Sequence, residues 1–108
     1  MTNERPQIEV LSFAGCPNAE PAADLVKRVT SELNIDANVE LIEVESEDQV
    51  KELRFLGSPS IRVNGHDIEP GADERSEYVY SCRVYRSESG LTGQPNEHWL
   101  RAALQHRD

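Results

Sequence analysis

The strongest constraint on the fold is a pair of short apolar runs separated by a helical pattern. The first run, at residues 8–13, reads IEVLSF and lies between Pro6 and Gly15, and the second, at residues 39–44, reads VELIEV. Between the runs, apolar residues recur at three- and four-residue steps, as one face of a helix requires: Ala22, Leu25, Val26, Val29 and Leu33. Because a strand–helix–strand unit joins its strands in parallel, the pattern predicts an α/β fold.

Two prolines restrict where this helix starts. Pro17 suits a first helical position, but Pro21 would then remove a hydrogen bond to the carbonyl of residue 17. If Asn18 is the N-cap instead, Pro21 falls at the third helical position and costs little. In either case Cys16 lies within about one turn of the helix N-terminus.

The next segments predict a second helix, a hairpin and a last helix. Ser46 and Gln49 have the spacing of a capping box, and Asn64-Gly65 suits the two-residue turn of a hairpin over residues 60–70. Asn96 precedes the amphipathic stretch EHWLRAALQ. We therefore expect a single domain over residues 1–108, with a mixed four-stranded sheet flanked by helices.

Residues 71–93 interrupt this regular pattern before the last helix. The stretch YVYSCRVY has β propensity, yet its surroundings are polar and punctuated by glycine. We expect a loop insertion with a possible short strand, which either covers the site as a lid or extends the sheet. Alternation on a half-buried strand would explain Tyr78, Tyr80 and Tyr85 without a ligand.

Charge and composition exclude several classes of partner. The formal net charge of -9 over 108 residues opposes binding to nucleic acid, because no surplus of cations is present to displace counterions. No apolar run approaches the roughly 20 residues that cross a membrane, and residues 1–7 lack the pattern of a secretion signal. We expect a cytoplasmic protein with no nucleic-acid or membrane partner.

Cysteines and histidines do not follow the spacing of a structural metal site. Cys16 and Cys82 are too few for a disulfide scaffold and lack the paired spacing of zinc ligands. His66, His98 and His106 are also spaced unlike ligands, so we expect surface histidines. No metal site and no cofactor are predicted.

Three separated segments carry a resemblance to a known family. They read GCPN at 15–18, GSPSIRVNG at 57–65 and SCRVYRSESGLTGQP at 81–95. Together they resemble small bacterial thioredoxin-like proteins, some of which are labelled alkylmercury-lyase-like, and the order of elements is similar to the thioredoxin fold. In that fold the cysteine at the start of the first helix faces a cis-proline, and Pro59 occupies the matching position. The resemblance implies that Pro17, Ser58 and Pro59 contact a substrate, with Ser58 presenting backbone groups to a peptide or glutathione.

The motif departs from two-cysteine thioredoxins at its fourth position. The C-x-x-C position reads Cys16-Pro17-Asn18-Ala19, and Ala19 cannot resolve a mixed disulfide. A second sulfur must come from glutathione, from another protein molecule or from Cys82. The flanking Arg83 would favour a Cys82 thiolate if the two groups lie close.

The sequence predicts thiol–disulfide exchange or thiol-dependent detoxification, with Cys16 and Cys82 as candidate catalytic residues. A helix N-terminus stabilises a thiolate at Cys16, although a small buried filler is the other interpretation. The expected partner is a thiol or disulfide, either glutathione or a protein. Two alternatives stay open: a soft metal ion such as mercury held by both thiolates, or a redox-inactive interaction module.

Overall fold

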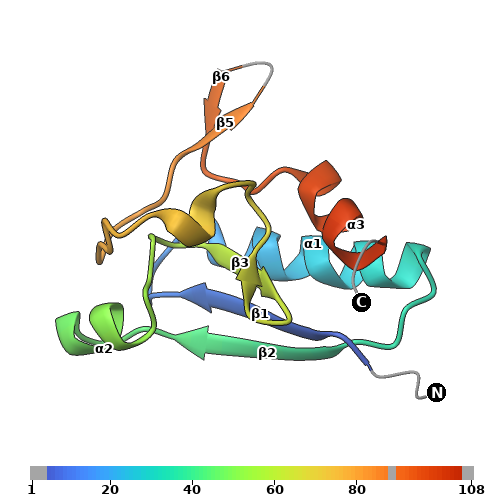
Figure 1. Ribbon diagram of the computed structural model, residues 1–108, viewed down its shortest axis with the longest axis horizontal. Helices are drawn as coiled ribbons and strands as arrows, with labels where there is room; N and C mark the ends of the chain where they lie inside the picture. The colour runs from blue at the N-terminus through green and yellow to red at the C-terminus, as the bar shows by residue number, and fades with distance from the viewer. Residues whose placement is uncertain (1–4, 88–89, 106–108) are drawn as a thin grey trace.

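The computed structural model describes residues 5–87 and 90–105 and contains one mixed sheet of four strands (Figure 1). The strands are β1 (Gln7–Ser12), β2 (Asn38–Glu43), β3 (Ser60–Val63) and β4 (His66–Asp67), in the order β2-β1-β3-β4. β1 pairs in parallel with β2 and antiparallel with β3, and β3 pairs antiparallel with β4. The predicted α/β class and mixed four-stranded sheet are confirmed.

Helix α1 (Ala19–Glu32) connects β1 to β2 and begins after Asn18. Asn18 as N-cap is therefore correct, and Pro17 as the first helical residue is wrong. Pro21 falls at the third helical position, where its missing N–H breaks no helical hydrogen bond. The Asn18 side chain makes no capping bond, because its oxygen instead accepts a hydrogen bond of 3.1 Å from Nε2 of Gln94.

The main core lies between the sheet and the helices α1 and α3 (Glu97–Gln105). Its buried residues come from β1, β3, the segment after β4 and both helices: Ile8, Val10, Ala22, Val26, Val29, Ile61, Val63, Ile68, Leu100 and Leu104. A second cluster contains Leu11, Val44, Val50 and Phe55 around α2 (Glu47–Glu52). Since side chains alternate along a strand, Val10 and Leu11 of β1 serve opposite faces of the sheet.

Local signals give most element boundaries to within one residue. The amide of Gln49 donates to Oγ of Ser46 at 3.2 Å, and the turn residues Asn64 and Gly65 have φ angles of 52° and 87°, as a hairpin turn of this kind requires. α3 covers the predicted stretch EHWLRAALQ. The first two strands begin and end one residue earlier than predicted, because their backbone pairing starts at Gln7 and Asn38.

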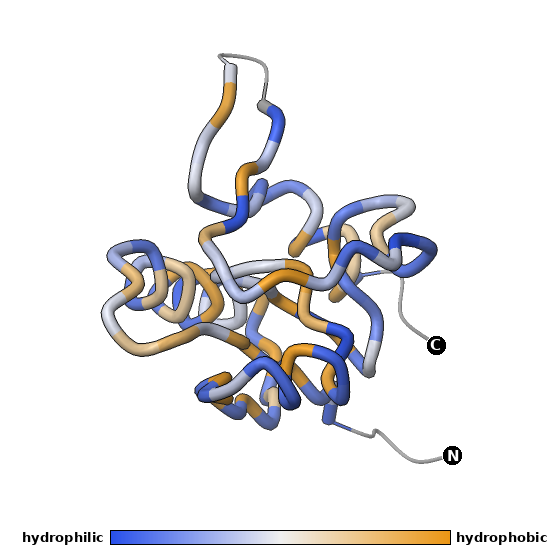
Figure 2. Tube along the Cα trace, turned by 90° about the vertical axis from the view of Figure 1, so that its left-hand side faces the viewer, coloured by the Kyte–Doolittle hydropathy of each residue, from blue (hydrophilic) through white to orange (hydrophobic). Residues whose placement is uncertain are grey.

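Residues 71–93 contain more structure than a loop. They include a short 3-10 helix η1 (Ala72–Glu74) and a hairpin of β5 (Tyr85–Ser87) and β6 (Gly90–Thr92). The hairpin projects from the body in Figure 1, and Figure 2 shows apolar segments on it as well as in the body. Before the hairpin, Cys82 forms an isolated parallel bridge with Ser58. The short strand expected in this segment is present as β5, which begins at Tyr85 and pairs with β6.

None of the helices in the described part of the chain has the length and apolar character needed to cross a membrane.

Replacing Gly57 with alanine should separate the segment before β3 from the segment around Cys82. Gly57 has a φ of +118°, and a Cβ there would lie 2.9 Å from the Cβ of Arg83 and 3.2 Å from the carbonyl oxygen of Ser81. We expect Gly57→Ala to lower the free energy of unfolding by about 2–4 kcal/mol in urea denaturation.

Gly65→Ala is the matched control, since Gly65 has a φ of +87° and nothing within 4 Å of the added Cβ. It should cost only the left-handed backbone penalty, about 1–2 kcal/mol. Equal losses in the two variants would contradict a steric role for the contact with Arg83.

Candidate functional site

A tight turn places Cys16 between β1 and α1. The amide of Cys16 donates to the carbonyl of Phe13 at 3.2 Å, and the Cys16 carbonyl accepts from the amide of Ala19 at 3.3 Å. Gly15 has a φ of 87°, which is the conformation that the third residue of a type II turn adopts and that favours glycine. The sequence Phe-Ala-Gly-Cys therefore fixes the cysteine just before the helix.

Cys16 is buried but lies outside the two main apolar clusters. Its exposed fraction is 8%, yet it belongs to neither of the apolar clusters formed by the described residues. Ala14, Gly15 and Pro17 around it are exposed. The burial of Cys16 agrees with a small side chain that fills the space between strand and helix, and the exposed residues beside it also allow a partner to approach this turn.

The structure brings together Ser58, Pro59 and Cys82, three of the predicted site residues. The amide of Ser58 donates to the carbonyl of Ser81 at 2.9 Å, and the amide of Arg83 donates to the carbonyl of Ser58 at 2.8 Å. The Ser58–Pro59 peptide bond is cis. Both backbone groups of Ser58 are thereby occupied, so the expectation that they face a bound peptide or glutathione is wrong.

The two cysteine-bearing segments touch through an aromatic pair. Phe13, three residues before Cys16, meets Tyr80, two residues before Cys82, edge to face with ring centroids 5.8 Å apart. Cys16 is buried, Cys82 is exposed, and both thiols are free. The Ser58 hydroxyl is buried without a hydrogen-bond partner in the described structure.

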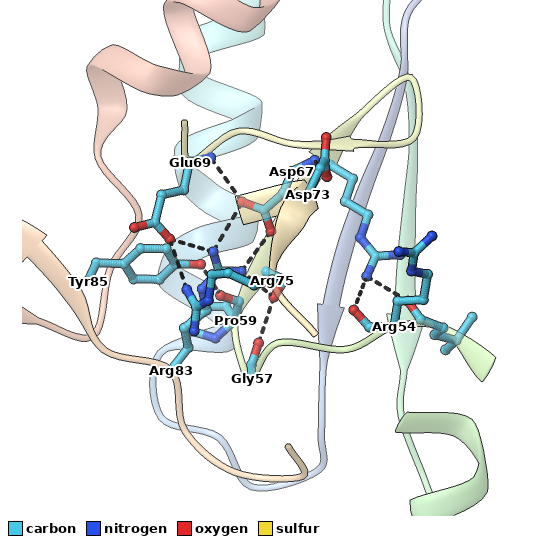
Figure 3. Close-up of polar contacts among 12 residues, drawn as sticks. Arg54, Gly57, Pro59, Asp67, Glu69, Asp73, Arg75, Arg83 and Tyr85 are labelled. Carbon is cyan, nitrogen blue, oxygen red and sulfur yellow. Dashed lines mark hydrogen bonds and ion pairs between the residues drawn. The ribbon is translucent and has the colours of Figure 1, made fainter. Parts of the chain in front are cut away.

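The Arg83 side chain points away from solvent into a buried polar cluster (Figure 3). It is 2% exposed and binds both carboxylate oxygens of Asp67, at 2.7 and 3.1 Å. It also donates to Glu69 at 2.7 Å and to the Ser60 hydroxyl at 2.8 Å. Burial opposes the charge, but these partners raise the pKa of Arg83 above its ordinary value. Both terminal nitrogens of Arg83 are therefore bound to carboxylates, whereas its Nε is buried without a hydrogen-bond partner among the described residues.

Tyr85 closes this cluster and connects it to Pro59. Its ring lies 4.5 Å from the guanidinium carbon of Arg83, and its hydroxyl donates to the Pro59 carbonyl at 2.5 Å (Figure 3). Burial, followed by the charges of Asp67 and Glu69, raises the pKa of Tyr85 above its ordinary value against the opposing charge of Arg83. The phenol is thus held neutral as a donor.

Sequence reasoning missed the cluster, although a weak signal exists. Arg83 and Tyr85 are two residues apart in one segment, and Asp67 and Glu69 are two residues apart in another. Residues two apart share a face of a strand. The face with Arg83 could therefore have been predicted to pack against the acidic face with Asp67 and Glu69. Nothing in the sequence says that these faces meet.

His66 and His98, the histidines in the described part of the chain, do not join a group of metal ligands. His66 is exposed and its Nδ1 lies 3.0 Å from Asp73, His98 is exposed, and His106 lies outside the described residues. No group of three or more His, Cys, Asp or Glu within residues 5–87 and 90–105 is arranged to hold a metal ion.

Comparison of the chain with protein-family models, curated proteins and solved structures found no match.

The raised pKa of Tyr85 predicts a loss of stability at high pH. An unfolded tyrosine ionises near pH 10, whereas the folded phenol stays neutral, so its contribution is complete below about pH 10 and declines above it. We expect the difference in unfolding free energy between wild type and Tyr85→Phe to shrink by about 1 kcal/mol from pH 10 to pH 11.

Urea denaturation across this range measures the effect, and Tyr80→Phe is the control because Tyr80 is 40% exposed. The difference between wild type and Tyr80→Phe should stay constant. A constant difference for Tyr85→Phe as well would contradict a neutral buried phenol.

Proposed function

We propose that this chain is a thioredoxin-like protein that performs thiol–disulfide exchange, with Cys16 as nucleophile and Cys82 as resolving thiol. The observation that carries the proposal is the parallel bridge between Ser58 and Cys82. It supplies a second cysteine beside Pro59 in a chain whose own motif ends in Ala19. The order of elements, with Cys16-Pro17 between β1 and α1 and Pro59 directly before β3, supports the thioredoxin-like assignment.

In the first step, the Cys16 thiolate attacks one sulfur of a partner disulfide. The partner's S–S bond breaks, its second sulfur leaves as a thiolate and takes up a proton, and Cys16 forms a mixed disulfide. The unpaired N–H groups and partial positive charge at the start of α1 stabilise the attacking thiolate. Pro17, which follows Cys16 in the chain, is exposed and can contact the partner.

In the second step, the Cys82 thiolate attacks the Cys16 sulfur. The mixed disulfide breaks, the partner leaves with its second thiol, and the protein holds a Cys16–Cys82 disulfide, so two electrons have passed to the partner. Two equivalents of a thiol such as glutathione then reduce the protein again and leave joined as a disulfide. Because backbone bonds hold residues 81–83 against Ser58, Cys82 occupies the place beside Pro59 that the family resemblance assigns to a bound partner.

Reaction with oxidised glutathione, followed by intact mass, tests the proposal. Cys82→Ser should accumulate one glutathionyl group on Cys16, whereas wild type should lose it and end two hydrogens lighter. Cys16→Ser should react at least about tenfold more slowly, since its remaining thiol lacks the helix N-terminus. Equal glutathionylation of Cys16→Ser and Cys82→Ser would contradict the assignment of Cys16 as nucleophile.

Ala19→Cys provides a matched rescue. In the Cys82→Ser background, this substitution recreates the C-x-x-C pair and should release the glutathionyl group from Cys16. Rescue would show that Cys82→Ser is defective because it lacks a second sulfur. A Cys16 adduct that persists in the double variant would contradict a resolving role.

A further inference from the structure

A cavity of about 280 Å³ lies on the face of β3 that is turned away from α1 and α3. Ile61 and Val63 of β3 pack into the main core, so Arg62 between them points to the opposite face. The lining comes from the loop before β3, the β3–β4 hairpin and the segment around η1, and includes Arg54, Arg62, Arg75 and Tyr78. Neither cysteine lines it, so the cavity is separate from the thiol site.

Two of its three arginines are held in place without a carboxylate partner. Nη2 of Arg62 donates to the carbonyls of Leu53 at 2.6 Å and Arg54 at 2.9 Å. Nε of Arg54 donates to the Tyr78 hydroxyl at 3.0 Å, and Figure 3 shows Arg54 apart from the Arg83 cluster. Within the described part of the chain neither guanidinium forms an ion pair. Their other N–H groups remain as donors at fixed positions.

Both carboxylates in the lining, Asp67 and Asp73, accept hydrogen bonds from groups within the chain. Asp67 is bound by Arg83, and its Oδ1 also accepts from the amide of Glu69. Asp73 accepts from the amide of Asp67 through Oδ1 and lies against His66 through Oδ2, both at 3.0 Å. Burial opposes ionisation of Asp73, but these contacts lower its pKa below the ordinary value. The charge of Asp73 also acts on Arg54 and Arg62 without a direct ion pair, but the three arginines of the lining outnumber its two carboxylates.

Arg75 adds a third cation with weak partners. It lies 3.6 Å from Glu69 and 3.8 Å from Glu77 and is 41% exposed, so such pairs hold it only loosely. A gathering of three arginines is unexpected on a chain with a formal net charge of -9 and 11 Lys and Arg residues in all. A random distribution of the cationic residues over the surface would not place three arginines around one cavity.

We infer that this cavity binds a small molecule through a multi-oxygen anionic group, a phosphate monoester or a compact carboxylate. The planar guanidinium matches the oxygens of either group with paired hydrogen bonds. The volume is at the lower end for small-molecule pockets, which favours a compact ligand over a nucleotide or a peptide. Tyr78, Leu56 and Ala72 supply apolar surface for its carbon skeleton.

Titration of the ¹⁵N-labelled protein with inorganic phosphate, followed by amide chemical shifts, tests the inference. A parallel titration with malonate distinguishes phosphate from carboxylate, and sodium chloride at matched ionic strength controls for screening. We expect saturable shifts at residues 54–56, 65–67 and 72–78 with phosphate, malonate or both. No saturable shift with either anion up to about 10 mM would overturn the inference.

Charge-removing variants assign the site. Arg54→Gln and Arg75→Gln should each weaken the binding at least about tenfold, while Arg86→Gln, on β5 and outside the lining, should leave it unchanged. Equal weakening by Arg86→Gln, or none by either cavity variant, would contradict the site. The two cavity arginines are largely exposed, so the thermal midpoint of each variant should stay close to that of wild type.

Discussion

The buried ion pair between Arg83 and Asp67 determines how the second half of this chain folds onto the sheet. Taking a guanidinium out of water is costly unless carboxylates and hydroxyls replace its hydration. Here Asp67, Glu69 and Ser60 do so at the two terminal nitrogens of Arg83, while its Nε has no hydrogen-bond partner among the described residues. Removing one partner of such a pair costs about 3–5 kcal/mol. An arrangement of residues 81–85 that withdrew Arg83 from these partners would leave the carboxylate of Asp67 buried and unpaired, so the cluster favours the observed arrangement.

That arrangement has chemical consequences because side chains alternate in an extended segment. Arg83 and Tyr85 face the buried cluster, while Cys82 between Ser81 and Arg83 is exposed beside Ser58. The tyrosine hydroxyl also binds the carbonyl of Pro59, so one cluster orders both the proline segment and the cysteine segment. In the proposed exchange reaction, this gives the chain the second sulfur that its motif lacks at Ala19.

The sequence predicted the parts of the fold that local patterns encode. The helical periodicity, the capping box at Ser46 and the Asn64-Gly65 turn each depend on neighbours in the chain, and the corresponding elements are present. Cys16 was singled out by its local position before the helix, whereas Pro59 was assigned through the family resemblance. The cluster around Arg83 was not, because its partners lie 14 to 23 residues away along the chain. The arginine cavity was missed for the same reason, and the β5–β6 hairpin was hidden in a polar, glycine-punctuated stretch.

The central claim is that the fold presents Cys82 to Cys16 within one chain. Oxidation of the reduced protein with one equivalent of diamide, followed by proteolysis and mass spectrometry of linked peptides, tests it most directly. The account predicts a monomer in which the peptides containing Cys16 and Cys82 are joined. Two free thiols, or disulfides that join only separate chains, would contradict it.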